Sequence, residues 1–594
     1  MPLGRRKVPF SGKAKKQQLQ AKRQSKTPWN DNERRVKSIL VAGSSDDDDE
    51  YSGDNVQKLN AQPVRSNQGS KANANRYVLQ FKRETEAELK EKKEQCRRAL
   101  VPVPETNLEI SSDHYFPADL KFPIRPPWDS NMTKEILDAK ENRYFTEYLK
   151  EIEKKYKETS YFELNLETWR QLWRVIEMLD IALVIVDIRF PSLMFPPYLF
   201  EYISNELKKS VILVLNKIDL VPASLVVAWK HYLEEKFPGI QVITFTSFPS
   251  YNLRTATHKK TGLNIRRCKG KMKMAAEGAQ KLYAACKEIV EDQVDISSWH
   301  SKIMEEMALE YDESDEIEIG ETVTLKRADT RYKGYKKFDG GILTIGCIGQ
   351  PNVGKSSLMN ALMGKKVVSV SRTPGHTKHF QTIFLTPQVR LCDCPGLVFP
   401  SMVPKPLQVI MGSYPIAQLR DPYSSVKFMA ERIDLVSMLK LEHPEHDDEW
   451  SAIDVCDGWA LKKGFYTARA ARLDTYRAAN HLLRMALDGK ITLAFAPPGY
   501  FANKATWEEH GDVQTVKWVQ GLSQAGGECS GSGALSEYES TDDESNASSA
   551  TTRMSVHARE NTNSSEGDEE DDEDSDDNRQ TTKNKFSLLN ASND

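Results

Sequence analysis

The sequence has no apolar run that approaches the roughly 20 residues a membrane-spanning helix needs, and its start is basic and polar. Without an apolar segment there, a secretory signal is not expected. Cysteine is scarce: eight occur in 594 residues, and only Cys392 and Cys394 lie close together. No second pair completes a cysteine zinc site. We therefore expect an intracellular protein with reduced thiols that has no contact with a membrane.

Net charge is nearly absent as well, at −3, so the overall value says little about partners. The charges are instead segregated along the chain. Residues 5–37 are rich in Lys and Arg, 44–50 read SSDDDDE, and 568–577 are nearly all Asp and Glu. Such blocks cannot bury enough apolar surface to fold alone. We predict a disordered basic arm over 1–75 and a disordered acidic tail over 521–594.

Between these tails, apolar segments alternate with amphipathic ones. The expected strands are 181–190, 210–219, 239–247, 341–350 and 389–396, and the expected helices are 166–180, 195–209 and 224–237. Fully apolar strands that alternate with helices indicate a parallel sheet covered on both faces. The fold class is therefore α/β.

The same patterns predict the domain organisation. A charged helix over 77–100 and a Pro-rich stretch belong to a helical or extended lead-in, 76–160. The α/β pattern spans 161–400 and is interrupted by a charged insertion at 251–340, which is too long for an ordinary loop. Helical patterns such as 467–489 predict a second, mainly helical domain over 401–520.

Residues 349–357, GQPNVGKSS, follow an apolar strand and open a helix, as a phosphate loop requires. Its glycines let successive backbone N–H groups point at phosphates. Lys355 reaches the β and γ oxygens, the Ser356 hydroxyl ligates Mg²⁺, and the helix points its positive end at the same anion. The predicted phosphate-binding residues are Gly349, Gln350, Pro351, Asn352, Val353, Gly354, Lys355, Ser356 and Ser357.

A second motif, Asp393-Cys394-Pro395-Gly396, ends the next apolar strand. Asp393 is predicted to hold Mg²⁺ through water, and Gly396 to offer its N–H to the γ-phosphate. Thr377, between the two motifs, is the candidate that senses the γ-phosphate through Mg²⁺; the alternative is an ordinary turn threonine. The neighbouring histidines fit polar loop residues better than catalytic bases: His376 and His379.

The stretch NKID, which ends the expected strand 210–219, indicates guanine recognition. The Asp219 carboxylate can accept from guanine N1–H and from the exocyclic amine, whereas adenine offers neither pairing. Buried groups left unpaired give large discrimination. Asn216 supports the loop, and the stem of Lys217 lies along the ring. The predicted base-binding residues are Asn216, Lys217, Ile218 and Asp219, backed by Thr246 and Ser247.

The order of these motifs is unusual, because the guanine motif precedes the phosphate loop. In this order the chain resembles the circularly permuted GTPases of the YlqF/YawG family. The stretches DIRFP (187–191) and PGHTKHFQT (374–382) are further matches, and the resemblance covers roughly 77–510. It implies a Ras-like P-loop domain cut and rejoined, GTP and GDP as ligands, and work in ribosome assembly or nucleolar traffic.

The resemblance also implies an unusual catalytic centre. Leu397 stands where Ras-like enzymes carry a water-orienting Gln, so the catalytic group is unknown and slow intrinsic hydrolysis is expected. Asn352 matches the asparagine of potassium-dependent relatives, so K⁺ bound there could supply the charge of an arginine finger. Two functions stay open: a Mg²⁺-dependent GTP-hydrolysing switch, and a GTP-ordered scaffold that binds RNA with negligible hydrolysis.

The permuted order predicts an output element. The chain leaves Gly396 directly into 401–520, so movement at the phosphate sensor would pull on that domain. The basic arm and the insertion are expected to contact RNA or pre-ribosomal particles through salt-sensitive phosphate contacts, or to act as a nuclear or nucleolar address. We expect a monomer, with candidate phosphorylation sites beside the acidic runs at Ser44, Ser45, Ser564 and Ser565.

Overall fold

The computed structural model describes most of the chain between the two tails. The described residues are 56–59, 78–129, 131–156, 159–246, 278–308, 336–364, 367–371, 373–375, 377, 379–467 and 472–520. All of them belong to one compact unit, Met1–Cys529. The predicted acidic tail and almost all of the basic arm lie outside the described residues, as do the candidate phosphorylation sites. The predicted domain boundaries remain predictions.

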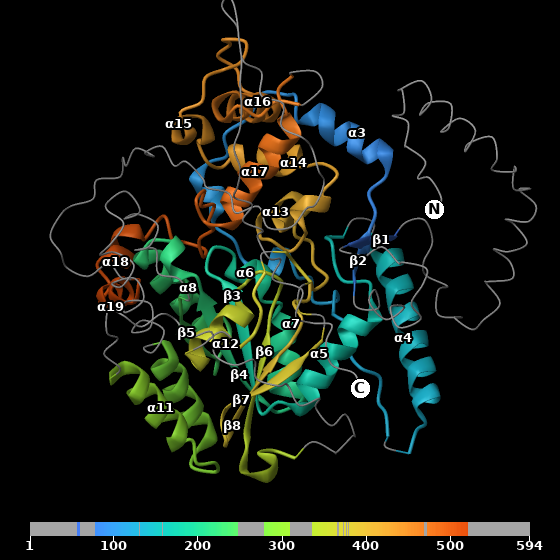
Figure 1. Ribbon diagram of the computed structural model, residues 1–594, viewed down its shortest axis with the longest axis vertical. Helices are drawn as coiled ribbons and strands as arrows, with labels where there is room; N and C mark the ends of the chain where they lie inside the picture. Colours follow the sequence, from blue (N-terminus) through green and yellow to red (C-terminus); the bar gives the residue numbers. More distant parts are fainter. Residues whose placement is uncertain are drawn as a thin grey trace, which may run out of the picture. The chain divides into compact units, whose positions relative to one another are not determined.

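A six-stranded sheet forms the centre of this unit (Figure 1). Its spatial order is β5-β4-β3-β6-β8-β7, and only β7 runs antiparallel to its neighbour. The strands are β3 Ile181–Asp187, β4 Ser210–Asn216, β5 Gln241–Thr244, β6 Leu343–Ile348, β7 Gln381–Thr386 and β8 Val389–Asp393. The expected parallel pairing is thus confirmed for β3, β4, β5, β6 and β8, whereas β7 was not expected and adds an antiparallel strand at the edge. Strand β6 pairs with β3, so the two halves of the permuted chain join in the middle of the sheet.

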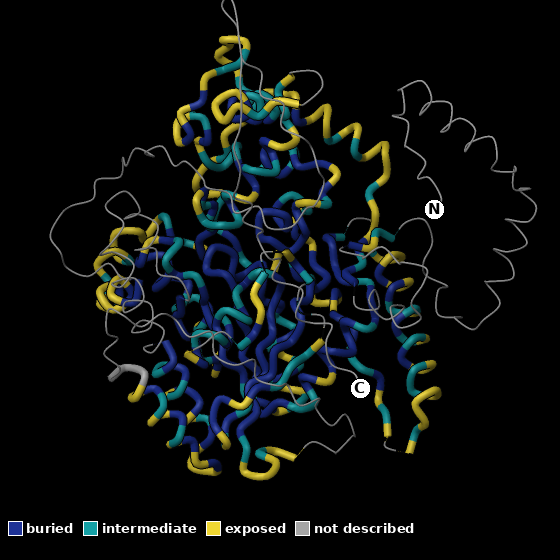
Figure 2. The backbone as a smooth tube through the Cα atoms, viewed as in Figure 1, coloured by how far each residue is buried: buried dark blue, intermediate teal, exposed yellow. Residues whose placement is uncertain are grey.

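The strands are buried on both faces, which explains their continuous apolar runs. Every residue of β3 and of β6 is buried, and Figure 2 shows the buried backbone concentrated around the sheet. The covering helices are α5 Leu166–Met178, α6 Pro191–Met194, α7 Pro197–Glu201, a π-helix Tyr202–Glu206, α8 Ala223–Lys236 and α12 Lys355–Met363. Short 3₁₀ turns are Ile218–Leu220 and Asp339–Gly341.

Two of these helices illustrate how the sequence sets their bounds. Helix α5 starts where the Asn165 side chain caps the N–H of Glu167, and it buries both tryptophans of its apolar stripe. The helix expected over 195–209 is confirmed in part: it begins at Pro197 as α7 and continues directly as a π-helix to Glu206. Proline has no N–H to donate and is tolerated in the first turn of a helix, so the helix begins at these prolines and not before them.

The lead-in also differs from expectation. Part of the predicted helix 77–100 is strand β2 Leu79–Lys82, which pairs with β1 Val56–Leu59 inside the predicted arm. The alternation in this segment buries Leu79 and Phe81 on one face, and that is a strand period. Further elements are α3 Glu86–Gln95, α4 Lys134–Lys155 and 3₁₀ turns Glu105–Leu108 and Ser112–His114.

The segment after β8 is mainly helical, as predicted. It contains α13 Lys405–Ile410, a 3₁₀ turn Ile416–Gln418, α14 Tyr423–Ala430, α15 Leu435–Leu439, α16 Ala452–Lys463, α17 Thr475–Leu487, α18 Lys504–Glu508 and α19 Asp512–Val519. Helices α13 to α17 gather at one end of the sheet, whereas α18 and α19 pack on α8 (Figure 1). The helix expected over 467–489 is shorter, because Asp474 caps α17 at Thr475.

The charged insertion is described only in part. A helix over 278–290 and α11 Ser297–Ala308 lie beside the sheet, where Ser298 Oγ donates to Gln388 Oε1 at 2.9 Å. The basic cluster and the acidic run of the insertion lie outside the described residues. Among the helices that the structure describes, none is long and apolar enough to cross a bilayer.

Candidate nucleotide site

The predicted motifs meet at one edge of the sheet. Strands β3, β4 and β8 end at Asp187, Asn216 and Asp393, and the phosphate loop begins at Gly349, directly after β6. Because these strands are parallel, their carboxyl ends lie side by side. Ligands of open α/β sheets bind in the crevice at this edge.

The phosphate loop needs its glycines for space and for backbone angle. A Cβ on Gly349 would lie 2.4 Å from the carbonyl oxygen of Ile185, and one on Gly354 would lie 2.3 Å from Asn216 Nδ2. Gly354 also has φ +100° where α12 begins, a conformation that glycine adopts readily. Any larger residue would therefore push the loop away from β3 and β4.

Lys355 lies folded onto its own loop. Its Nζ donates to the carbonyl oxygens of Gly349 and Gln350 at 2.9 and 2.7 Å. The side chain is buried, and burial lowers its pKa against the opposing charge of Asp393. The Lys355 ammonium thus lies in the centre of the loop, and the two backbone carbonyl oxygens accept the hydrogen bonds that an anion would otherwise accept.

Asp393 and Ser356 form the second half of the phosphate end. Ser356 Oγ donates to Asp393 Oδ2 at 3.1 Å. Burial raises the pKa of Asp393 to about 6, opposed by Lys355 and by the Ser356 hydroxyl. The other carboxylate oxygen, Oδ1, is buried and has no hydrogen-bond partner among the described residues. A buried carboxylate with an unsatisfied oxygen beside a hydroxyl suits a small divalent cation.

The DCPG motif lies directly against the phosphate loop. A Cβ on Gly396 would be 2.8 Å from the Cα of Pro351, so only glycine fits there. The next residue, Leu397, donates its N–H to the Gly349 carbonyl at 3.3 Å and buries its side chain almost completely. The side chain that replaces the usual glutamine therefore lies in the core.

The base motif is tied to the phosphate loop by two hydrogen bonds. Asn216 Nδ2 donates to the Val353 carbonyl at 2.7 Å, across 137 positions of sequence. Lys217, in a left-handed conformation with φ +61°, donates to the Asn352 carbonyl at 2.8 Å. The two motifs that are separated in the chain are thus one structural unit.

Asp219 is held by the neighbouring strand end. Thr246 Oγ1 donates to Asp219 Oδ1 at 2.6 Å. Burial raises the pKa of Asp219 to about 6, against the opposing hydrogen bond from Thr246. Ser247 lies outside the described residues.

The other predicted site residues are placed less distinctly. Thr377 is half-buried between α12 and β7, and no hydrogen bond between described residues joins it to Ser356 or Asp393. His379 is exposed, and His376 lies outside the described residues. Cys394 and Pro395 are buried under the loop, and Ser357 is half-buried on α12.

Sequence reasoning missed an ion pair behind the site. Asp187 accepts from the guanidinium of Arg189 at 3.0 and 2.8 Å and from Lys217 at 2.8 Å, and both Asp187 and Arg189 are fully buried. Burial alone would raise the pKa of Asp187, but Arg189 and Lys217 outweigh it and hold that pKa below its usual range. The available signal was a carboxylate at the carboxyl end of a buried strand.

The helical segment after β8 reaches the site directly, which the sequence did not indicate. Asn352 Nδ2 donates to the Gly412 carbonyl at 2.8 Å, and Ser413 Oγ donates to Gln350 Oε1 at 2.8 Å. Arg189 donates to the Ala486 carbonyl at the end of α17 at 2.7 Å.

A fourth contact from the segment 401–520 supports the base motif. Gln520, which follows α19, donates to the carbonyls of Ile218 and Val221 at 2.7 and 2.9 Å. The Gln520 side chain is almost completely buried. Both ends of the site are therefore in contact with the segment 401–520.

A phosphate loop, a DxxG strand end and an NKxD strand end, joined in permuted order on one sheet, define the class: a circularly permuted P-loop GTPase fold. A family model described as 50S ribosome-binding GTPase matches residues 344–444, which contain the phosphate loop and the DCPG motif. The base motif lies before that match.

Comparison with curated proteins gives the particular family. The guanine nucleotide-binding protein-like 1 proteins of Mus musculus and Homo sapiens are each 44% identical over 543 residues, which cover 87% of this chain and 89% of theirs. The chain belongs to the guanine nucleotide-binding protein-like 1 family. The large subunit GTPase 1 homolog of Mus musculus is 30% identical over 64% of this chain and 66% of its own.

Solved structures of YlqF are similar over a smaller share of the chain. The GDP-bound and GNP-bound forms from T. maritima are each 16% identical to it. They cover 56% of this chain and 98% and 97% of their own, with TM-scores of 0.30 and 0.31.

Proposed function

We propose that the protein binds GTP and GDP at this site and hydrolyses GTP slowly as a switch. The observation that carries the proposal is the direct bonding of the base motif to the phosphate loop, from Asn216 to Val353 and from Lys217 to Asn352. This bonding holds the purine-binding and phosphate-binding ends at a fixed separation. The test is binding of GDP, GTP and ATP to the purified chain, where ATP competition equal to that of GDP would refute the assignment.

Mg²⁺ fits the phosphate end. Ser356 and Asp393 would hold it, because the buried Asp393 Oδ1 lacks a partner among the described residues and Ser356 already contacts the other oxygen. When bound, the ion neutralises phosphate charge. Thr377 remains the candidate for a third contact. Lys355 would exchange its two loop carbonyls for phosphate oxygens, and the start of α12 would add its backbone N–H groups.

The burial of Leu397 supports the proposal of slow hydrolysis. An apolar side chain in the core cannot orient the attacking water, so turnover needs a group from elsewhere. The same observation favours a second candidate function, a GTP-ordered scaffold that binds RNA without appreciable hydrolysis. Single-turnover hydrolysis with and without ribosomal subunits distinguishes the two: stimulation supports the switch, and none at any subunit concentration supports the scaffold.

K⁺ is a candidate for part of the positive charge that an arginine finger would otherwise supply to the phosphates. Asn352 engages its amide nitrogen with the Gly412 carbonyl, so its side-chain oxygen is the atom that could face a cation. GTP turnover should then be faster in potassium than in sodium buffer, and equal rates in the two buffers would exclude this role.

The output element is the segment 401–520. Its Gly412 and Ser413 contact the phosphate loop, and its Gln520 contacts the base motif. A change in the loop on γ-phosphate loss would therefore be felt by this segment without an intermediate element. Partners that bind it should distinguish the GDP-bound from the GTP-bound protein; equal binding would refute the proposal.

RNA or pre-ribosomal particles are the proposed partners, in ribosome assembly or nucleolar traffic, with a nuclear or nucleolar location. The support is the Lys- and Arg-rich composition of residues 5–37, since contacts to nucleic-acid phosphates need clustered cations. Purification with a non-hydrolysable GTP analogue should recover bound RNA, and that RNA should be released as salt rises. Recovery that is the same after removal of residues 5–37 would refute the role of the arm.

A further inference from the structure

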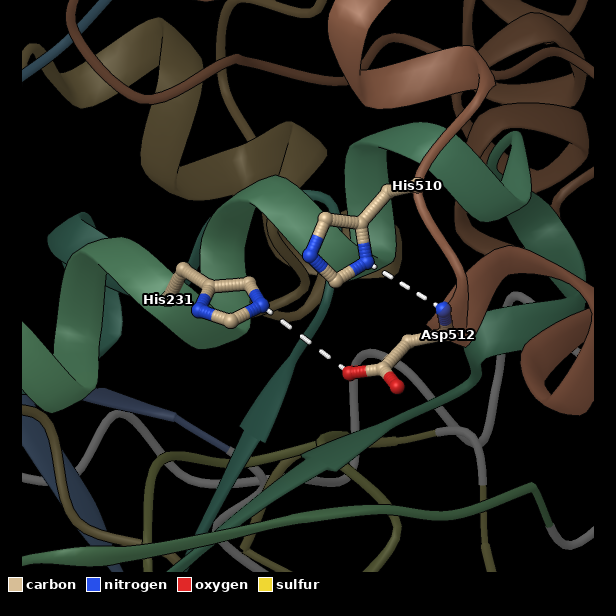
Figure 3. Close-up of side chains that lie close together, drawn as sticks. All are labelled: His231, His510 and Asp512. Carbon is tan, nitrogen blue, oxygen red and sulfur yellow. Dashed lines mark hydrogen bonds and ion pairs between the residues drawn. The ribbon is translucent and has the colours of Figure 1, made fainter.

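Three metal-ligating side chains meet on the surface of α8, outside the nucleotide site. His231 lies on α8, His510 lies just before α19, and Asp512 is the first residue of α19. Their ligand atoms all lie within 4.8 Å of one another. Figure 3 shows the His231 ring facing the Asp512 carboxylate, with the His510 ring beside both. His231 is 279 positions from His510 and 281 from Asp512 along the chain, so no sequence motif indicates the cluster.

Each histidine of this cluster has a ring nitrogen that is available to bind an ion. His231 Nε2 is buried without a hydrogen-bond partner among the described residues, because Asp512 Oδ2, at 3.9 Å, is too far away for a hydrogen bond. His510 Nδ1 accepts the Asp512 N–H at 3.2 Å, which occupies the lone pair of that nitrogen, so Nε2 is the His510 nitrogen that is left to bind an ion. Unprotonated imidazole nitrogen is the form that binds metal.

We propose that His231, His510 and Asp512 bind a divalent transition-metal ion of the Zn²⁺ class. Two imidazole nitrogens and one carboxylate form the donor set of three-ligand zinc sites, with water in the fourth position. Imidazole donors favour Zn²⁺, Cu²⁺ or Ni²⁺ over Mg²⁺ and Ca²⁺. This site therefore takes a different ion from the one that the nucleotide needs.

The distances allow the ion to enter with side-chain motion alone. Ligand atoms about 2 Å from a tetrahedral ion are roughly 3.3 Å apart, against up to 4.8 Å here. The side chains of His231 and Asp512 are 41% and 50% exposed, so both can rotate inward. Trp507 packs near both rings, with centroids 5.8 Å from His231 and 6.1 Å from His510, and limits their freedom.

Lys230 competes with the ion for the same carboxylate. Its Nζ lies 3.9 Å from Asp512 Oδ2, the same atom that faces His231. A cation bound there would repel the ammonium and displace it to solvent, since the Lys230 side chain is one-third exposed. Removal of the Lys230 charge should therefore strengthen metal binding.

A bound ion would fasten α19 to α8. Gln520, which follows α19, holds the carbonyls of Ile218 and Val221 in the base motif. The site would thus support the base-binding loop through α19 and Gln520. This consequence rests on the proposed function, whereas the metal site itself does not.

The experiment titrates the chelator-treated full chain with Co²⁺ and Zn²⁺ in the absence of nucleotide. We expect visible Co²⁺ absorption of a site with imidazole ligands and a rise in Tm with Zn²⁺. His231→Ala, His510→Ala and Asp512→Asn should each weaken binding at least tenfold and abolish the Tm rise, and Lys230→Gln should tighten binding. His300→Ala, an exposed histidine on α11, is the matched control and should behave like the wild type.

Wild-type titration curves for both histidine variants would overturn the proposal, as would equal weakening by His300→Ala. Asp512→Asn keeps the shape of the side chain at the start of α19, so its loss of binding would not reflect misfolding. Because nucleotide is absent, a negative result here leaves the GTP assignment untouched.

Discussion

Replacement of Asp219 by Asn should make the nucleotide-free protein more stable and nearly abolish guanine binding. Burial of the carboxyl raises the pKa of Asp219 to about 6 in the folded protein, against an ordinary value of 3.8. A difference of about two pKa units corresponds to about 3 kcal/mol at 1.36 kcal/mol per unit. Asn has no charge to bury and keeps an oxygen that can accept from Thr246.

The sign of the pH dependence follows from linkage. The folded state binds the Asp219 proton more tightly than the unfolded state, so the contribution of Asp219 to wild-type stability falls as pH rises from about 4 to about 6. The Asp219→Asn variant does not lose stability in this way, because its side chain has no proton to release. Its stability advantage should be small near pH 4 and should grow to at most about 3 kcal/mol above pH 7.

Binding should change in the opposite direction. Two hydrogen bonds from guanine to a carboxylate, at about 1.5–3 kcal/mol each, correspond to a loss of roughly a hundredfold to ten-thousandfold in GDP affinity. The amide can donate to the O2 of xanthine, which replaces the guanine amine. Xanthosine diphosphate should therefore bind the variant more tightly than GDP does.

Urea unfolding at pH 4.5 and 7.5 and a nucleotide competition assay measure both effects. All other titrating groups are common to the two proteins, so the difference between their unfolding free energies isolates Asp219. The reasoning is refuted if the difference is the same at both pH values, or if the variant retains GDP affinity within threefold.

Three further substitutions test the remaining contacts. Gly396→Ala places a Cβ 2.8 Å from Pro351 Cα, so GTP affinity should fall at least tenfold and GDP affinity much less; equal losses in competition binding would contradict this. Gln520→Ala leaves two buried carbonyls unpaired. It should lower the free energy of unfolding in urea by about 1–3 kcal/mol and speed nucleotide release. Gln514→Ala, at an exposed position, should do neither. Asn352→Ala should equalise GTP turnover in potassium and sodium buffers; a persisting potassium preference would place the ion elsewhere.

Much of the fold could be predicted because its signals are local. The apolar runs of β3, β4, β6 and β8 are long and bounded by polar residues. Strands that are buried on both faces of a parallel sheet have such continuous apolar runs, so these segments could be assigned as strands. Errors arose where local signals compete. The charged composition around α3 concealed the strand alternation of β2, and the prolines at 196 and 197 moved the start of a helix that was expected to begin at residue 195.

The site was predictable only as far as its motifs are contiguous. The phosphate loop and NKID each contain the spacing that their chemistry requires, so residues such as Lys355 and Asp219 could be named from the sequence. The supports behind them could not. Gln520 and Gly412 belong to no motif, and the DIRFP stretch gave Arg189 no role. The contacts of all three depend on α17, α19 and the turn after α13 returning to the sheet.

The sequence by itself determined which nucleotide chemistry is present and in which order its motifs occur along the chain. That order places the phosphate sensor last, directly before the helical segment. Tertiary structure decided what the sensor touches, because contacts between distant segments arise from packing. Only the folded chain joins Asn216 to Val353, brings Gly412 to Asn352, and places His231 beside Asp512.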